Sequence, residues 1–232
     1  DSSYNSYVGS GVQGLGGMAN YAATPGYHAI GTISGSANPY LAKFDANGVQ
    51  QWMTVVGAGG GGDTIAEAEN LSVTQDGAGG ILMGYLVRRA MFAAGSAFTG
   101  TPGVVNLLGS PNGKTDLAFG KYSMTTGAQQ WVTELSANGA GSYSSPISVS
   151  PAKDHNGAPF VLTVGSTGGV FDGTPGFTEL GASPGSSGLV GAYSSTDGTQ
   201  VWLWQFDHAS VNGALQDSSG NTLVYGTTTA PY

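Results

Sequence analysis

A short pattern typical of catalytic serines occurs in one glycine-rich stretch of the chain. Residues 181–185, Gly-Ala-Ser-Pro-Gly, fit the Gly-x-Ser-x-Gly pattern of a nucleophile elbow. That elbow needs a strand before the serine and a helix after it, because together they lift the hydroxyl out of a sharp turn. Here Pro184 follows Ser183, and no helical periodicity follows Pro184. We therefore predict that Ser183 is not a nucleophile.

A second stretch comes close to a phosphate-binding loop. Residues 109–115, Gly-Ser-Pro-Asn-Gly-Lys-Thr, have three residues between the two glycines, whereas the motif has four. Loop length decides where the backbone N–H groups point, so we predict a turn here. The glycine run at 57–62 has no following lysine or helix and is interpreted as a linker.

Metal ligands are the third chemistry that the residue types could support. The histidines His28, His155 and His208 are far apart in the sequence and lack metal-ligand spacing. Residues 45–48 and 154–157 resemble the first half of a calcium loop, but no Glu follows at the twelfth position. Asp and Asn also stabilise turns by accepting hydrogen bonds from their own backbone. We therefore expect turns at these places, with no metal and no cofactor.

A modification site is indicated by one sequon. Asn70-Leu71-Ser72 fits the acceptor pattern for N-glycosylation. In a secreted protein Asn70 is a candidate glycan site, at the start of an expected strand.

Composition restricts the protein class. The 232 residues include 41 Gly and no Cys, and 40% are hydrophobic, which is too many for a disordered chain. Only 9% are charged, with a net charge of −8, so the surface is neutral, polar and unsuited to nucleic acid. No apolar run reaches the roughly 20 residues that span a bilayer. The chain opens at Asp1 without Met, which we interpret as a processed or trimmed form.

A Gly-x-Gln-x-Trp motif occurs three times and predicts a repeated β-hairpin. Each copy follows an alternating apolar segment and a turn, and each is followed by another alternating segment. Strand, tight glycine turn and strand are typical of a hairpin. The repeated residues are Gly48 and Trp52, Gly127 and Trp131, and Gly198 and Trp202.

A second hairpin lies between the tryptophan hairpins. Asp-Gly or Asp-x-x-Gly turns join β-prone runs over residues 71–85, 147–165 and 214–226. A Phe-x-Gly-Thr-Pro-Gly loop follows at 98–103 and again at 171–176. Two hairpins joined by such a loop make four antiparallel strands, which is the composition of a β-propeller blade.

These features predict an all-β chain forming a single repeat domain of about four blades. The expected units are residues 15–62, 63–140, 141–208, and a partial unit 209–232 joined by residues 1–14. Residues 7–13 resemble the Gly-x-Gln hairpin, so the two termini could close one ring of four. The alternative is an open arc of about three and a half blades, completed by a second copy or by further sequence, although open sheet edges are rarely left uncovered.

The order of motifs resembles the SBBP β-propeller repeat family, which occurs mostly in secreted and cell-surface proteins. The resemblance rests on the hairpins ending at Gly84 or Gly165, the 98–103 loop, and residues 116–131. It implies a propeller scaffold without shared catalytic residues. The glycine-to-tryptophan hairpin is also similar to the tryptophan-docking repeat of quinoprotein propellers, which implies that Trp52, Trp131 and Trp202 pack one blade against the next.

Three functions follow as hypotheses. The first is a non-catalytic, extracellular or cell-surface structural or interaction module, with protein partners or self-assembly and no enzyme activity. The second is a carbohydrate-binding propeller in which Tyr27, Tyr40 or Trp204 stacks on sugars, although Trp204 shares a strand face with Trp202, which favours the core. The third is a quinone-dependent propeller enzyme; we disfavour it because the chain is short and poor in Arg, Lys and Glu.

Overall fold

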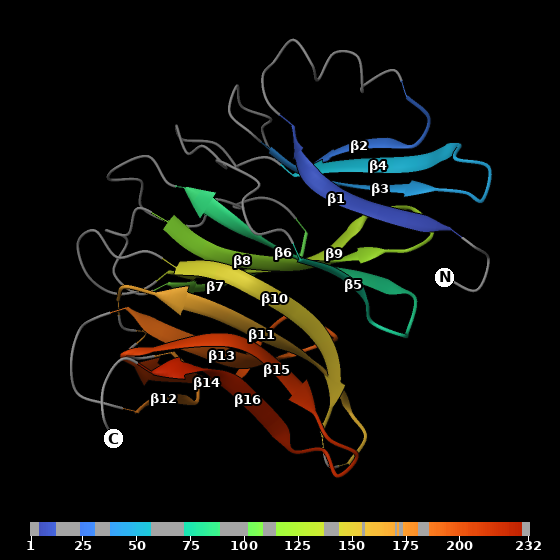
Figure 1. The fold of residues 1–232 in the computed structure, drawn as a ribbon. Coiled ribbons are helices and arrows are strands. Elements are labelled where there is room, and N and C mark those ends of the chain that lie inside the picture. Colours follow the sequence, from blue (N-terminus) through green and yellow to red (C-terminus); the bar gives the residue numbers. More distant parts are fainter. Residues whose placement is uncertain are drawn as a thin grey trace.

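The computed structural model shows an all-β protein (Figure 1). It describes residues 5–12, 24–30, 38–56, 72–88, 102–108, 115–136, 144–154, 156–169, 171, 174–180 and 186–228. Every regular element in these residues is a β-strand, so the predicted fold class is confirmed at that level. No helix among them is long and apolar enough to cross a membrane.

The strands form four sheets that follow one another in chain order (Figure 1). The first sheet contains β1 (Ser6–Val12), β2 (Tyr27–Ile30), β3 (Asn38–Phe44) and β4 (Gln50–Val56). The second contains β5 (Ser72–Gln75), β6 (Gly80–Arg88), β7 (Val104–Leu108), β8 (Thr115–Ser123) and β9 (Gln129–Ser136). The third contains β10 (Ser144–Lys153), β11 (Pro159–Thr167), β12 (Phe177–Leu180), β13 (Ser187–Ser194) and β14 (Gln200–Asp207). The last contains β15 (Ala209–Gln216) and β16 (Thr222–Thr228).

The second and third sheets have the same topology. Their strand orders are β5-β6-β8-β9-β7 and β10-β11-β13-β14-β12, with two antiparallel hairpins side by side. The short strands β7 and β12 pair in parallel with β9 and β14 at the outer edge. We expected four antiparallel strands per unit, so this fifth strand is a correction. It forms because the backbone carbonyls of Gly103 and Gly176, at the end of the Thr-Pro-Gly turn, accept hydrogen bonds from Val132 and Leu203 and align the chain beside the tryptophan strand.

The N-terminal segment belongs to the first sheet. β1 pairs antiparallel with β3 along its whole length, in the position that β6 holds beside β8. Gly9 lies opposite Leu41 as Gly84 lies opposite Phe119, so β1 corresponds to the second strand of an Asp-turn hairpin. The assignment of residues 1–14 to the last unit was therefore wrong. The first and last sheets lie at opposite ends of the stack (Figure 1).

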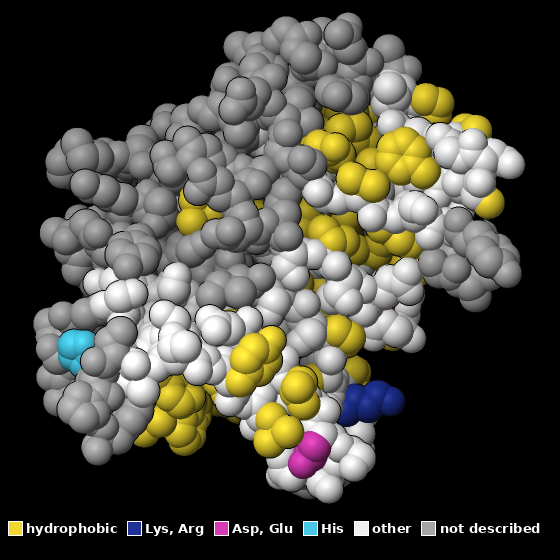
Figure 2. Space-filling view, in the orientation of Figure 1, with side chains coloured by type: hydrophobic (Ala, Val, Ile, Leu, Met, Phe, Trp, Pro, Cys, Tyr) yellow, Lys and Arg dark blue, Asp and Glu magenta, His cyan; other side chains and the backbone are white. Residues whose placement is uncertain are grey.

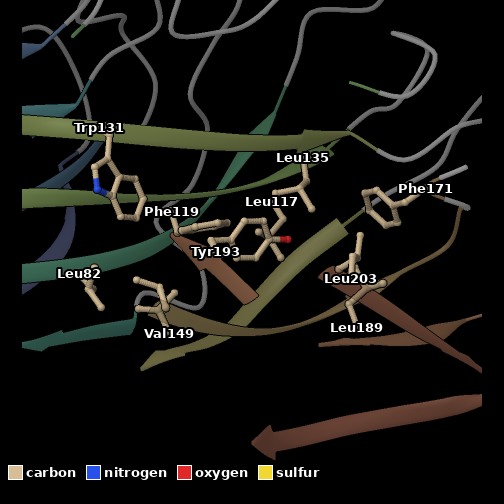
Figure 3. Packing of buried hydrophobic residues seen from close by; sticks show 11 residues of the cluster. Leu82, Leu117, Phe119, Trp131, Leu135, Val149, Phe171, Leu189, Tyr193 and Leu203 are labelled. Carbon is tan, nitrogen blue, oxygen red and sulfur yellow. The ribbon is translucent and has the colours of Figure 1, made fainter. Parts of the chain in front are cut away.

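Side chains between successive sheets form the core. The largest cluster lies between the second and third sheets, where Phe119 contacts both Trp131 and Tyr193 (Figure 3). The Phe119 ring centroid lies 5.9 Å from that of Trp131 at 86°, and 4.5 Å from that of Tyr193 at 60°. All three side chains are fully buried. Tilted and edge-on aromatic pairs at these distances add to the stabilisation from buried area.

Candidate interaction surface on the third sheet

The first tryptophan of the repeat, Trp52 on β4, holds the turn between β8 and β9. Its Nε1 donates to the carbonyl oxygen of Met124 at 3.2 Å, and Lys43 Nζ donates to the same oxygen at 3.3 Å. Thr54 Oγ1 donates to the Gly127 carbonyl oxygen at 2.6 Å. Three donors on one sheet therefore bind two carbonyl groups in a turn of the next sheet.

The second tryptophan, Trp131 on β9, repeats this arrangement on the turn between β13 and β14. Trp131 Nε1 and Lys121 Nζ donate to the Ser195 carbonyl oxygen at 3.2 and 3.1 Å. Thr133 Oγ1 donates to the Gly198 carbonyl oxygen at 2.6 Å. Both docked tryptophans are almost completely buried.

Glycine is required in both docked turns for two reasons. Gly127 and Gly198 have φ of +74° and +75°, in the left-handed region that favours glycine. A Cβ at either position would also lie 2.6 Å from Cε3 of the docked tryptophan. The spacing between Gly and Trp therefore places each glycine under the tryptophan of the preceding sheet, not under its own.

The third tryptophan, Trp202 on β14, lacks this arrangement. Ala192 stands where Lys43 and Lys121 stand in the other copies, paired with Trp202 as they pair with Trp52 and Trp131. Trp204 stands two residues after the tryptophan, where the other copies have threonine. Trp202 is half-buried, and within the described part of the chain its Nε1 has no hydrogen-bond partner.

The remaining glycine of the motif, Gly48, lies in a different turn. The Gly48 N–H donates to the carbonyl three residues earlier, whereas those of Gly127 and Gly198 donate four residues back. A Cβ added to Gly48 would meet nothing within 4 Å. No tryptophan of the described residues therefore docks on this shorter turn.

An open cavity of about 580 Å³ lies where the third sheet extends beyond the β15–β16 hairpin. Trp204 is 39% exposed, and its ring centroid lies 6.3 Å from that of Phe206 at 34°. The cavity wall carries no charged side chain. It is formed by Gly176 and Thr178 near and on β12, Val190 on β13, Trp202, Trp204 and Phe206 on β14, and Thr222 and Val224 on β16.

The expectation that Trp204 lies in the core was wrong. Trp202 and Trp204 do share one face of β14, as the alternation predicted. That face is covered only where β15 packs on β11 and β13, through Val211 against Gly188. β14 and β12 extend past this cover, so their side chains reach solvent.

The last hairpin also exposes apolar side chains on its other face. Leu215, Leu223 and Tyr225 are each at least half exposed. In the described chain β16 pairs only with β15, so its second edge has no strand beside it. Figure 2 shows hydrophobic side chains among neutral polar ones on the face in view, with very few charged groups among the coloured atoms.

One ion pair contributes to the sheet contacts. Asp76 Oδ2, in the β5–β6 turn, lies 2.7 Å from Lys121 Nζ, the lysine that also binds the Ser195 carbonyl. Burial raises the pKa of Asp76, but the hydrogen bonds from Lys121 and from the backbone N–H groups of Ala78 and Gly80 outweigh it. The pKa of this carboxyl group is therefore held below its ordinary value.

The calcium-like segments form aspartate turns. Asp45 Oδ1 and Asp154 Oδ1 each accept hydrogen bonds from the backbone N–H groups two and four residues later. Asp76 and Asp217 do the same in the other hairpins. No group of three His, Asp or Glu side chains in the described residues could hold a metal ion. The prediction of turns is confirmed at these positions.

A buried polar cluster at the end of β14 contains a serine and a carboxylate. The Ser187 hydroxyl donates to Asp207 Oδ1 at 2.8 Å, and Gln205 Nε2 donates to the same oxygen at 3.2 Å. The serine binds the carboxylate directly, without the imidazole that takes the proton in a catalytic triad. The cluster therefore satisfies buried polar groups and is not arranged as a nucleophile.

The other sequence candidates have these positions. His208 forms the turn between β14 and β15 with a φ of +54°, and His28 is exposed on β2. Tyr27 and Tyr40 pack against the Met53 cluster of the first sheet and are half-buried. Asn70, His155, Ser183 and residues 57–62 and 109–114 lie outside the described residues.

Comparison with known proteins gives no relative. No protein-family model matches the chain, and no curated protein sequence matches it.

Proposed function

We propose that this protein is a non-catalytic interaction module on a β-propeller-type scaffold, secreted or displayed on a cell surface, that serves as a subunit of an extracellular assembly. One observation carries the proposal: the third tryptophan face is open, aromatic and uncharged, whereas the equivalent faces of the first two sheets are sealed. Large exposed apolar patches on soluble proteins mark interaction sites.

The charge pattern supports a neutral partner. The chain has 6 Lys and Arg and 14 Asp and Glu in 232 residues, and none of them lines the cavity. An uncharged wall gives no preference to an ionic ligand, while Trp and Phe side chains supply most of the energy in protein interfaces. The motif order that resembles SBBP repeats agrees with this extracellular role.

Native mass by light scattering at several concentrations tests the proposal. We expect species heavier than the 23.2 kDa chain as concentration rises, since the apolar surface favours association. Trp204→Thr, which restores the residue of the other two copies, should shift the protein to the monomer. Val201→Thr is the matched control because Val201 is exposed on the other face of β14. A constant mass of 23.2 kDa for all three proteins would contradict the assembly role.

Carbohydrate binding is the second candidate, supported by the Trp204–Phe206 pair and the neighbouring threonines. The two rings lie 34° apart, and Thr178 and Thr222 place hydroxyl groups beside them. Aromatic faces with a few convergent polar groups are typical of small-ligand sites. Titration calorimetry with neutral oligosaccharides should then show binding that Trp204→Thr abolishes; heat signals equal in both proteins would rule this role out.

A further inference from the structure

The repeat shows which strand belongs beside β16. In the first three sheets the strand equivalent to β16 pairs antiparallel with the first strand of a tryptophan hairpin: β1 with β3, β6 with β8, and β11 with β13. β16 has β15 on one side and, in the described residues, no strand on the other. An edge strand with free N–H and C=O groups is a template for another strand.

The register of β16 is fixed by a bulge shared with β11. The β10–β11 pairing shifts just before Gly165, and the β15–β16 pairing shifts just before Gly226. Gly226 is therefore the counterpart of Gly165. A Cβ at Gly226 would collide with the Ser210 carbonyl, so the bulge itself requires glycine there.

An apolar side chain fills the space beside the counterpart glycine. Leu189 on β13 lies opposite Gly165, is 2% exposed and points toward the preceding sheet. A strand added to β16 would place its own residue opposite Gly226, on the face that carries Thr222 and Val224. That residue would point into the cavity over Trp202 and Trp204.

The second strand of an added hairpin would cover the rest of the cavity. β9 lies outside β8, and β14 outside β13, so a following strand would lie over β14 and β12 of the third sheet. The cavity of about 580 Å³ has room for several apolar side chains, and its uncharged wall favours neutral ones.

We propose that β16 binds a β-hairpin of a partner polypeptide by antiparallel strand addition, with an apolar residue opposite Gly226 and neutral side chains over Trp204. This rests on the proposed function and names the partner class. Ala192 and Trp204 remove two of the three donors that hold the docked turns, so main-chain pairing and apolar burial hold this partner instead.

A hairpin from this chain serves as the probe. A labelled peptide of residues 186–207 contains β13 and β14 and places Leu189 in the position opposite Gly226. Fluorescence anisotropy with the whole protein should show saturable binding at micromolar concentration. The peptide with Leu189→Asp should bind about tenfold more weakly or not at all, because its carboxylate would enter the apolar cavity.

Protein variants separate strand addition from nonspecific adhesion. Trp204→Thr should weaken peptide binding about tenfold, while Val201→Thr should bind like the wild type. Equal binding of the two peptides, or no binding of either, overturns the proposal. Failure of the peptide together with Trp204-dependent self-association overturns strand addition and leaves the proposed function standing; absence of both overturns both.

Discussion

The tryptophans of the first two sheets and that of the third occupy equivalent places but have different surroundings. Trp52 and Trp131 are each buried under a glycine turn of the next sheet and share a carbonyl oxygen with a lysine. Trp202 is half-buried beside Ala192 and Trp204, over an open cavity. One motif therefore serves two purposes: in the first two copies it joins sheets, and in the third it forms part of an exposed surface. The two neighbouring positions, and not the tryptophan, decide which.

The largest expected difference is the cost of removing the aromatic ring. Trp131→Ala should lower the free energy of unfolding by about 3–5 kcal/mol, because it leaves a cavity between two sheets. Trp202→Ala should cost only about 1–2 kcal/mol, since its ring already contacts solvent on one side. Denaturant unfolding monitored by circular dichroism measures both; equal losses would show that the third face is covered as the others are.

A methyl group on the turn glycines should separate the docked turns from the free one. Gly198→Ala should destabilise by about 3 kcal/mol, because the left-handed backbone and the contact with Trp131 both oppose a Cβ. Gly48→Ala meets only the backbone penalty of about 1 kcal/mol, as nothing lies near its added Cβ. Thermal unfolding of the two variants tests this, and a Gly48→Ala loss as large as that of Gly198→Ala would count against the docking role.

The threonine donors should contribute less than the rings. Thr133→Val keeps the shape but leaves the buried Gly198 carbonyl oxygen without its 2.6 Å hydrogen bond, which should cost about 1–2 kcal/mol. Thr227→Val, at an exposed position of β16, is the control and should change stability by less than about 0.5 kcal/mol. Urea unfolding compares them, and a neutral Thr133→Val would remove the hydrogen bond from the explanation of docking.

The smallest effect concerns pH. The pKa of Asp76 is lowered in the folded protein, so its contribution to stability is present above the ordinary carboxyl pKa of about 4 and is lost as the pH falls through the lower, folded value. Wild type should therefore exceed Asp76→Asn in stability by about 1 kcal/mol at pH 7, and the difference should shrink below about pH 4. A difference that stays constant from pH 7 to pH 3 would contradict this.

The sequence predicted the strands of each hairpin because alternation and Asp or Gly turns are local signals. It did not reveal β7 and β12, since their parallel pairing depends on a distant strand. It also misplaced β1, because seven residues without their partner β3 carry no register. Gly84 and Gly165 looked equivalent, but the pairing sets Gly84 opposite Ser72 and Val164 opposite Ser148.

The candidate surface was only half visible in the sequence. Comparison of the three copies would have shown Lys43 and Lys121 replaced by Ala192, and Thr54 and Thr133 replaced by Trp204. What the substitutions mean could not be read locally, because the carbonyl groups that the lysine and threonine bind lie more than 60 residues away. The exposure of Trp204 likewise depends on how far the β15–β16 hairpin reaches across the third sheet.

Hydrogen–deuterium exchange on β11 and β16 tests the central comparison most directly. In dilute protein the amides of β16 (Thr222–Thr228) should exchange much faster than those of β11 (Pro159–Thr167), because β11 has strands on both sides. Addition of the 186–207 hairpin should slow exchange in β16 and leave β11 unchanged. Slow exchange in β16 of the dilute protein, or no change with saturating hairpin, would contradict the account of an open third face.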